Sequence, residues 1–66
     1  MARRDVQPGQ RYQKVDGSSI WVVVELTTDG EGIVHARVTR SGDSTTVKML
    51  SVSALRDARM YKLLDA

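Results

Sequence analysis

The sequence contains no cysteine and no phenylalanine, and only one histidine and one proline among its 66 residues. The lack of cysteine excludes disulfides, thiol catalysis and thiolate zinc sites, and it favours a reducing compartment such as the cytoplasm. With a single histidine, the remaining ligands are scattered carboxylates that do not match a calcium loop. We therefore expect neither a metal site nor a cofactor.

Long apolar runs are also missing. The longest run, Ile20 to Val24, is far shorter than the roughly 20 residues that cross a bilayer. The first six residues contain two arginines but no following apolar stretch, as a secretory signal would require. These absences predict a cytoplasmic protein without a membrane partner.

The charge balance is close to neutral, with ten basic and eight acidic side chains and a formal net charge of +2. So small an excess does not decide whether the chain binds nucleic acid. The length is that of one domain. Residues 1–8, which end at the only proline, are expected to form a flexible N-terminal arm, and residues 9–66 a single small domain.

Three segments have a hydrophobic period of two, which is typical of β-strands. They span residues 20–27, 34–39 and 46–50, and Gly, Asp and Ser residues separate them. The pattern predicts an antiparallel meander with one apolar face. The residues expected on that face are Ile20, Val22, Val24, Leu26, Val34, Ala36, Val38, Val47 and Met49.

The two loops between these strands suggest a register. Ser41 to Ser44 fits a two-residue hairpin with Gly42 and Asp43 at its tip, and Asp29 to Gly32 fits a three-residue loop with a left-handed glycine at Gly32. On the inward face this register aligns two rows, Val24–Val38–Val47 and Leu26–Ala36–Met49. On the outward face it aligns Glu25, Arg37 and Lys48.

The two ends of the chain add further elements. Residues 9–15 are expected to form a short first strand with Tyr12 turned inward. The stretch from residue 53 to 64 allows two interpretations: one continuous helix, or a helical turn at 53–57 followed by a closing strand at 60–64. The second uses Leu55, Tyr61 and Leu63 more coherently, so we favour it.

This order of elements, over residues 9 to 64, resembles that of an SH3-like barrel. The predicted fold is thus mainly β: a small SH3-like antiparallel barrel of about five strands with one short helical turn before the last strand. The alternative is a three- or four-stranded meander with a C-terminal helix. The resemblance implies a non-catalytic module that binds peptides, modified tails or nucleic acids, and it assigns no binding residue.

Catalysis is not expected. His35 is the only histidine and falls on the outward side of its strand, so no Ser-His-Asp arrangement can be assembled. Asp29 and Glu31 belong to a turn, where acidic residues are common. We therefore predict that the protein is not an enzyme.

The outward row has two interpretations. Glu25, Arg37 and Lys48 can form an alternating charged row, or Arg37, Lys48 and Arg40 can form an anion-binding strip. Trp21 is either buried by a bend in the second strand or exposed as a stacking platform. The pair formed by Arg56 and Asp57 is expected to be a local ion pair.

Two functions follow from these patterns. The first is a binding module that recognises another protein or its own copy as a homodimer, since a small sheet has exposed edges. The alternative is nucleic-acid binding through Arg37, Lys48 and Arg40, with Trp21 or Tyr12 stacking on bases.

Overall fold

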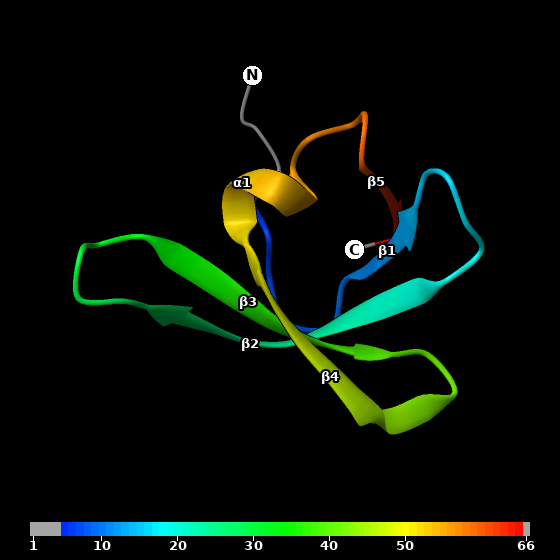
Figure 1. The fold of residues 1–66 in the computed structure, drawn as a ribbon, viewed down its shortest axis with the longest axis horizontal. Coiled ribbons are helices and arrows are strands. Elements are labelled where there is room, and N and C mark those ends of the chain that lie inside the picture. Colours follow the sequence, from blue (N-terminus) through cyan, green and yellow to red (C-terminus); the bar gives the residue numbers. More distant parts are fainter. Residues whose placement is uncertain (1–4, 66) are drawn as a thin grey trace.

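The computed structural model describes residues 5–65, which form one antiparallel five-stranded sheet and a short helix (Figure 1). The strand order across the sheet is β4-β3-β2-β1-β5. The prediction of a mainly β fold, with a helical turn before the last strand, is confirmed. The elements are β1 (Arg11–Lys14), β2 (Ile20–Thr28), β3 (Val34–Arg40), β4 (Asp43–Ser51), α1 (Val52–Leu55) and β5 (Tyr61–Asp65).

The sheet is open, so the predicted barrel does not close. β4 and β5 are the two edges, and within the described residues no ladder joins them. In Figure 1 the β2–β3 hairpin extends away from α1 and from the β1–β5 pair. No helix in the described part of the chain is long and apolar enough to span a membrane.

The core lies between the sheet, α1 and the segment that precedes β1. All three aromatic side chains belong to it, so Tyr12 is turned inward as predicted and Trp21 is buried by the bend in β2. Three partly buried side chains, Leu50, Val52 and Leu63, pack against it. The buried apolar residues are Val6, Tyr12, Trp21, Val23, Ala36, Val38, Leu55 and Tyr61.

The packed domain begins earlier than the sequence analysis places it. Val6 is only 3% exposed and belongs to the core. The Gly9 N–H donates a hydrogen bond to the Val23 carbonyl at 2.9 Å, which joins this segment to β2. The packed region therefore includes Val6, which the sequence analysis assigns to the arm. Residues 1–4 of the expected arm lie outside the described residues.

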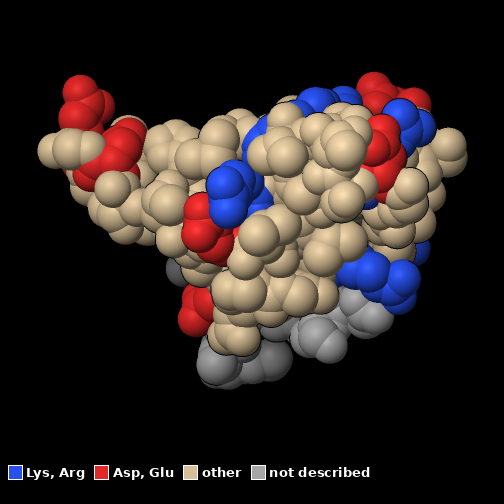
Figure 2. All heavy atoms as spheres, turned by 90° about the horizontal axis from the view of Figure 1, so that it is seen from below, with Lys and Arg blue, Asp and Glu red and all other residues tan. Residues whose placement is uncertain are grey.

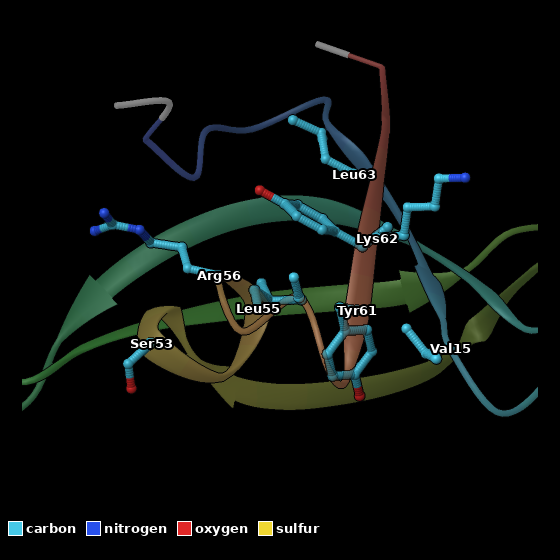
Figure 3. A pocket seen from close by; sticks show the side chains of 9 residues that line it. Val15, Ser53, Leu55, Arg56, Tyr61, Lys62 and Leu63 are labelled. Atoms are coloured by element: carbon cyan, nitrogen blue, oxygen red, sulfur yellow. The ribbon is translucent and has the colours of Figure 1, made fainter. Parts of the chain in front are cut away.

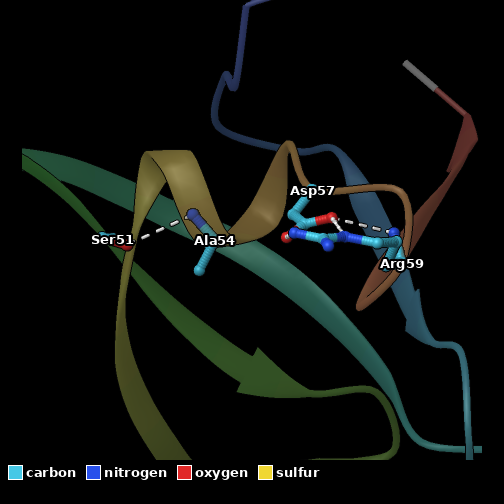
Figure 4. A network of polar contacts seen from close by, with 4 residues as sticks. All are labelled: Ser51, Ala54, Asp57 and Arg59. Carbon is cyan, nitrogen blue, oxygen red and sulfur yellow. Dashed lines mark hydrogen bonds and ion pairs between the residues drawn. The ribbon is translucent and has the colours of Figure 1, made fainter.

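The C-terminal stretch divides into a helical turn and a strand, as favoured. Ser51 caps α1, because its Oγ accepts a hydrogen bond from the Ala54 N–H at 3.2 Å (Figure 4). Leu55 and Tyr61 are both buried. One straight helix would place these two side chains on different sides, whereas the turn and strand direct both into the core.

The outer half of the β2–β3 hairpin has the predicted register. Glu25 pairs with Arg37 and Leu26 with Ala36. The loop ends in Gly32 at φ +83°, and the Asp29 N–H donates to the Ile33 carbonyl. Closer to the centre, however, a bulge between Val23 and Glu25 shifts the pairing by one residue.

That bulge corrects the predicted inward face of β2. Val38 pairs with Val23 rather than with Val24. Trp21 and Val23 are therefore buried, whereas Val24 is exposed. The sequence places Val24 inward because strict alternation has no place for an extra residue.

The predicted register of the β3–β4 hairpin is wrong by one position. Val47 lies opposite Thr39 rather than Val38, and Met49 lies opposite Arg37. The tip consists of Ser41 and Gly42, since Arg40 already pairs with Asp43. The ladder is irregular between Thr39 and Arg40, where residues 44–46 form a bulge.

The bulge in β4 has a local cause. The Asp43 carboxylate accepts hydrogen bonds from the hydroxyls of Thr45 and Thr46, at 2.6 and 2.7 Å. It also accepts one from the Thr45 N–H at 3.2 Å. These bonds fold residues 44–46 back onto Asp43, so Val47 resumes the ladder with its side chain on the outer face, where it is 50% exposed.

Candidate interaction surfaces

The predicted strip of Arg37 and Lys48 does not form. Side chains that lie directly opposite each other on neighbouring strands share a face. Lys48 is opposite the buried Val38, whereas Arg37 is opposite Met49 on the outer face. The two cations therefore lie on opposite sides of the sheet, and the prediction that they face each other is wrong.

Arg37 takes part in an exposed ion pair. Its Nη2 lies 3.0 Å from Glu25 Oε2, and both side chains are about half exposed. A pair of this kind contributes little stability because water screens it. Arg37 is thus partly neutralised where it was expected to bind an anion.

Lys48 and Arg40 lie on the other side of the sheet, next to Trp21. Lys48 Nζ is 4.6 Å from the centroid of the Trp21 ring, within the range of a cation–π contact. Arg40 pairs with Trp21 across the β2–β3 ladder. Within the described part of the chain, neither cation has a carboxylate at ion-pair distance.

The two aromatic side chains that were expected to stack on a ligand are both in the core. Trp21 and Tyr12 are each 4% exposed. The Tyr12 hydroxyl donates to Gln10 Oε1 at 2.9 Å. In this conformation neither ring presents a face on which a base could stack.

Figure 2 shows the face of the molecule on the side of the β3–β4 hairpin. Basic and acidic groups are interspersed on it, and uncharged side chains occupy most of its centre. The end that carries the β2–β3 loop is acidic, consistent with Asp29 and Glu31 in that loop. This face has no continuous positive strip.

The regular part of β4, Val47 to Ser51, forms a surface that we call the β4 edge. Along this segment β4 pairs with β3 residue by residue without interruption. Its other side has no strand partner within residues 5–65. Val47 and Met49 project from the outer face beside this edge and are 50% and 55% exposed.

A second surface is an open groove of about 950 Å³ between α1 and β5 (Figure 3). Its floor is apolar and largely buried, and its rim is exposed. The floor consists of Tyr12, Leu55, Tyr61 and Leu63, and the rim of Val15, Ser53, Arg56, Ala58 and Lys62.

Among the described residues that line it, the groove has two cations and no acidic side chain. In Figure 3 the side chains of Arg56 and Lys62 extend in opposite directions. The predicted ion pair between Arg56 and Asp57 is absent. Asp57 instead binds Arg59, with Arg59 Nη2 3.1 Å from Asp57 Oδ2 (Figure 4), because Arg59 lies two residues on, where the turn folds back.

Three aspartates hold the loops of the molecule. Hydrogen bonds from Arg59 lower the pKa of Asp57, and the same contact raises the pKa of Arg59. Backbone N–H groups of Ile33 and Glu31 lower the pKa of Asp29. The hydroxyls of Thr45 and Thr46 lower the pKa of Asp43. Each carboxylate therefore stays ionised as the acceptor that closes its loop.

The single histidine lies near one of these aspartates. His35 Nδ1 is 3.8 Å from Asp29 Oδ2, and both side chains are partly exposed. Within the described residues, no cluster of three or more His, Cys, Asp or Glu side chains could hold a metal ion.

The sequence analysis did not identify the groove. Its floor combines Tyr12 of β1 with residues of α1 and β5, which lie about forty to fifty residues further along the chain, so no local pattern joins them. Leu55, Tyr61 and Leu63 were recognised as core residues, which is the nearest signal available. Comparisons of the chain with protein-family models, curated proteins and solved structures find no match.

Proposed function

We propose that this protein is a small non-catalytic module for protein–protein interaction, and that its β4 edge pairs with the β4 edge of a second copy. The observation that carries this proposal is the unpartnered segment Val47 to Ser51, beside which Val47 and Met49 are at least half exposed. The absence of cysteine is the ground for placing this function in the cytoplasm.

The β4 edge has few of the features that prevent strand pairing. Soluble proteins protect their edges with proline, bulges and charged residues. The bulge at residues 44–46 protects only the first half of β4. The second half contains no proline and one charge, Lys48.

Self-pairing is geometrically simple here. Two antiparallel copies related by a two-fold axis form an isologous contact, in which the same residues meet on both sides. A two-fold axis at Met49 places Lys48 opposite Leu50 and Val47 opposite Ser51 of the second copy. An axis at Lys48 would bring two like charges together, which destabilises a sheet.

Cysteine cross-linking tests this arrangement, because the chain has no cysteine of its own. Under mild oxidation Met49→Cys should form a disulfide dimer, since directly opposed residues in a sheet have suitable Cα separations. Val15→Cys is the matched control, because Val15 is 54% exposed and Met49 55%. Val15 directly follows β1, which β3 and β2 separate from β4 in the sheet.

Equal dimer yields for the two cysteine variants would contradict the proposed contact. Sedimentation of the unmodified protein provides the second measurement. We expect association that is weak and depends on concentration, since an edge contact of five residues a side is small. Met49→Lys should abolish this association.

A second candidate function is binding of a nucleic-acid backbone through Arg40 and Lys48. The specific observation in its favour is that both cations lie on the Trp21 side of the sheet and that neither forms an ion pair within 4.0 Å among the described residues, although Arg40 lies opposite Asp43 and acts on its carboxylate at longer range. Affinity for a DNA oligonucleotide should then fall steeply with salt, and Arg40→Ser with Lys48→Ser should flatten that dependence. Absence of binding at low salt would contradict it.

A further inference from the structure

The groove between α1 and β5 lies apart from the β4 edge and shares no lining residue with it. One wall is the strand β5, which contributes three consecutive residues, Tyr61 to Leu63, to the lining. Successive side chains of a strand point to opposite faces. All three can border one groove only if the edge of the strand, with its backbone, runs along it.

This edge of β5 has no strand partner. β5 pairs with β1 on one side and is the last strand of the sheet on the other. An extended peptide can add a strand to such an edge, with main-chain hydrogen bonds for affinity and alternate side chains in pockets. The groove offers the pocket, because Tyr61 of β5 and Leu55 of the neighbouring α1 are both buried and form an apolar floor along the strand.

The charges of the rim define the ligand further. Arg56 and Lys62 are exposed, and within residues 5–65 neither has a carboxylate at ion-pair distance. Asp57, the acidic neighbour of Arg56 in the sequence, is occupied by Arg59 (Figure 4). The rim therefore complements negative charge.

The directions of the two cations exclude a compact anion as the best ligand. Arg56 and Lys62 point away from each other (Figure 3), so they do not converge on one phosphate group. Between them lies an apolar floor rather than a continuous row of cations, which a nucleic-acid backbone would require. The arrangement fits an elongated ligand with an apolar middle and an acidic group at each end.

We propose that this groove binds an extended peptide segment of a partner protein, in which apolar residues lie between two acidic residues and pair with the edge of β5. Leu55, Tyr61 and Leu63 would contact the apolar residues. Arg56 and Lys62 would each face one acidic side chain. The site shares no residue with the β4 edge, so either proposal can fail without the other.

Selection from a library of random seven-residue peptides, displayed on phage, tests the proposal with the full chain. We expect enrichment of peptides with apolar residues in the centre and Asp or Glu towards both ends. The charge-reversed variant Arg56→Glu with Lys62→Glu should bind the enriched peptides about tenfold more weakly. Selection on that variant should instead enrich peptides with Lys or Arg at the ends.

The matched control is Arg40→Glu with Lys48→Glu, which makes the same change in net charge on residues that do not line the groove. Its affinity for the enriched peptides should stay within about twofold of the unmodified protein, since only screened long-range charge effects remain. Circular dichroism would verify that both variants fold. If one double variant does not fold, its two single substitutions replace it.

Four results of the binding experiments would overturn the proposal. They are no enriched peptide, enrichment without acidic residues, equal weakening by both double variants, and displacement of the bound peptide by an oligothymidine competitor, which would indicate a nucleic-acid site. Changes in amide chemical shifts on peptide binding test the location of the site independently. Peptide binding should shift Leu55, Ala58 and Leu63, and shifts confined to β4 would contradict the location.

Discussion

The two hairpins that share β3 are closed in different ways. In the β2–β3 hairpin, Asp29 closes the loop: its backbone pairs with Ile33, and its carboxylate accepts the N–H groups of Glu31 and Ile33. In the β3–β4 hairpin, Asp43 binds the hydroxyls of Thr45 and Thr46, which follow the turn. The first loop continues the ladder directly, whereas the second interrupts it with a bulge.

This difference decides which residues reach the core. Beyond the first loop the register continues through Leu26 and Ala36. Beyond the second loop the bulge turns Val47 outward and directs Lys48 to the face of Val38. A short polar side chain at the start of β4 thus determines which apolar residues are available on the surface for a partner.

The largest effect is expected from a test of the register itself. Val38 is fully buried, whereas Val47, which the sequence places beside it, is 50% exposed. Val38→Ala should lower the free energy of unfolding by about 2 kcal/mol, because it removes buried methyl groups and leaves a cavity. Val47→Ala should change it by less than about 0.5 kcal/mol. Urea unfolding measures both, and equal losses would indicate that Val47 faces inward.

A smaller loss is expected at the second turn. Gly42 has φ +86°, whereas Gly30 in the first loop does not have a positive φ. Neither position has an atom within 4 Å of an added Cβ, so any difference comes from the backbone. Gly42→Ala should cost about 1 kcal/mol, and Gly30→Ala much less. Thermal melts of the two variants make the comparison, and equal melting temperatures would contradict it.

Acid should weaken the second hairpin through Asp43. Its hydrogen bonds favour the carboxylate and hold the pKa below the ordinary value of 3.8. The stabilisation is therefore complete above the ordinary pKa and is lost as the pH falls through the lower value of the folded state. Asp43→Asn should have a lower free energy of unfolding than the unmodified protein at pH 7. The difference between the two free energies should become smaller below pH 3.8. Unfolding curves at a series of pH values measure this difference, and a difference that does not change with pH would contradict the prediction.

The smallest effect is expected for the exposed ion pair between Glu25 and Arg37. A double-mutant cycle on Glu25 and Arg37, whose atoms lie 3.0 Å apart, should give a coupling of about 0.2–1 kcal/mol, which added salt reduces. The same cycle on Arg37 and Lys48 should give a coupling near zero, because they lie on opposite faces. A measurable repulsion between them would restore the register that the sequence suggests.

Much of the fold follows from local patterns. The period of two marks β2, β3 and β4, and Gly32 marks the end of the first loop. The division of the C-terminal stretch follows from Leu55, Tyr61 and Leu63, which can share one core only if the helix ends early. The predicted binding residues do not form one surface. Trp21 and Tyr12 are buried, and Arg37 and Lys48 lie on opposite faces of the sheet.

The sequence by itself indicated the three central strands and their antiparallel order, because hydrophobic period and turn residues act over a few neighbours, and it favoured a helical turn before a last strand. Only the tertiary structure decided which side chains lie on the inner and outer faces of the sheet, and which of them meet in a candidate binding surface. The bulge in β2 inserts one extra residue and the bulge in β4 inserts three. Both numbers are odd, so each bulge exchanges the inner and outer faces of the residues beyond it. The groove in turn requires β1, α1 and β5 to meet, and that meeting depends on which side chains the bulges direct into the shared core.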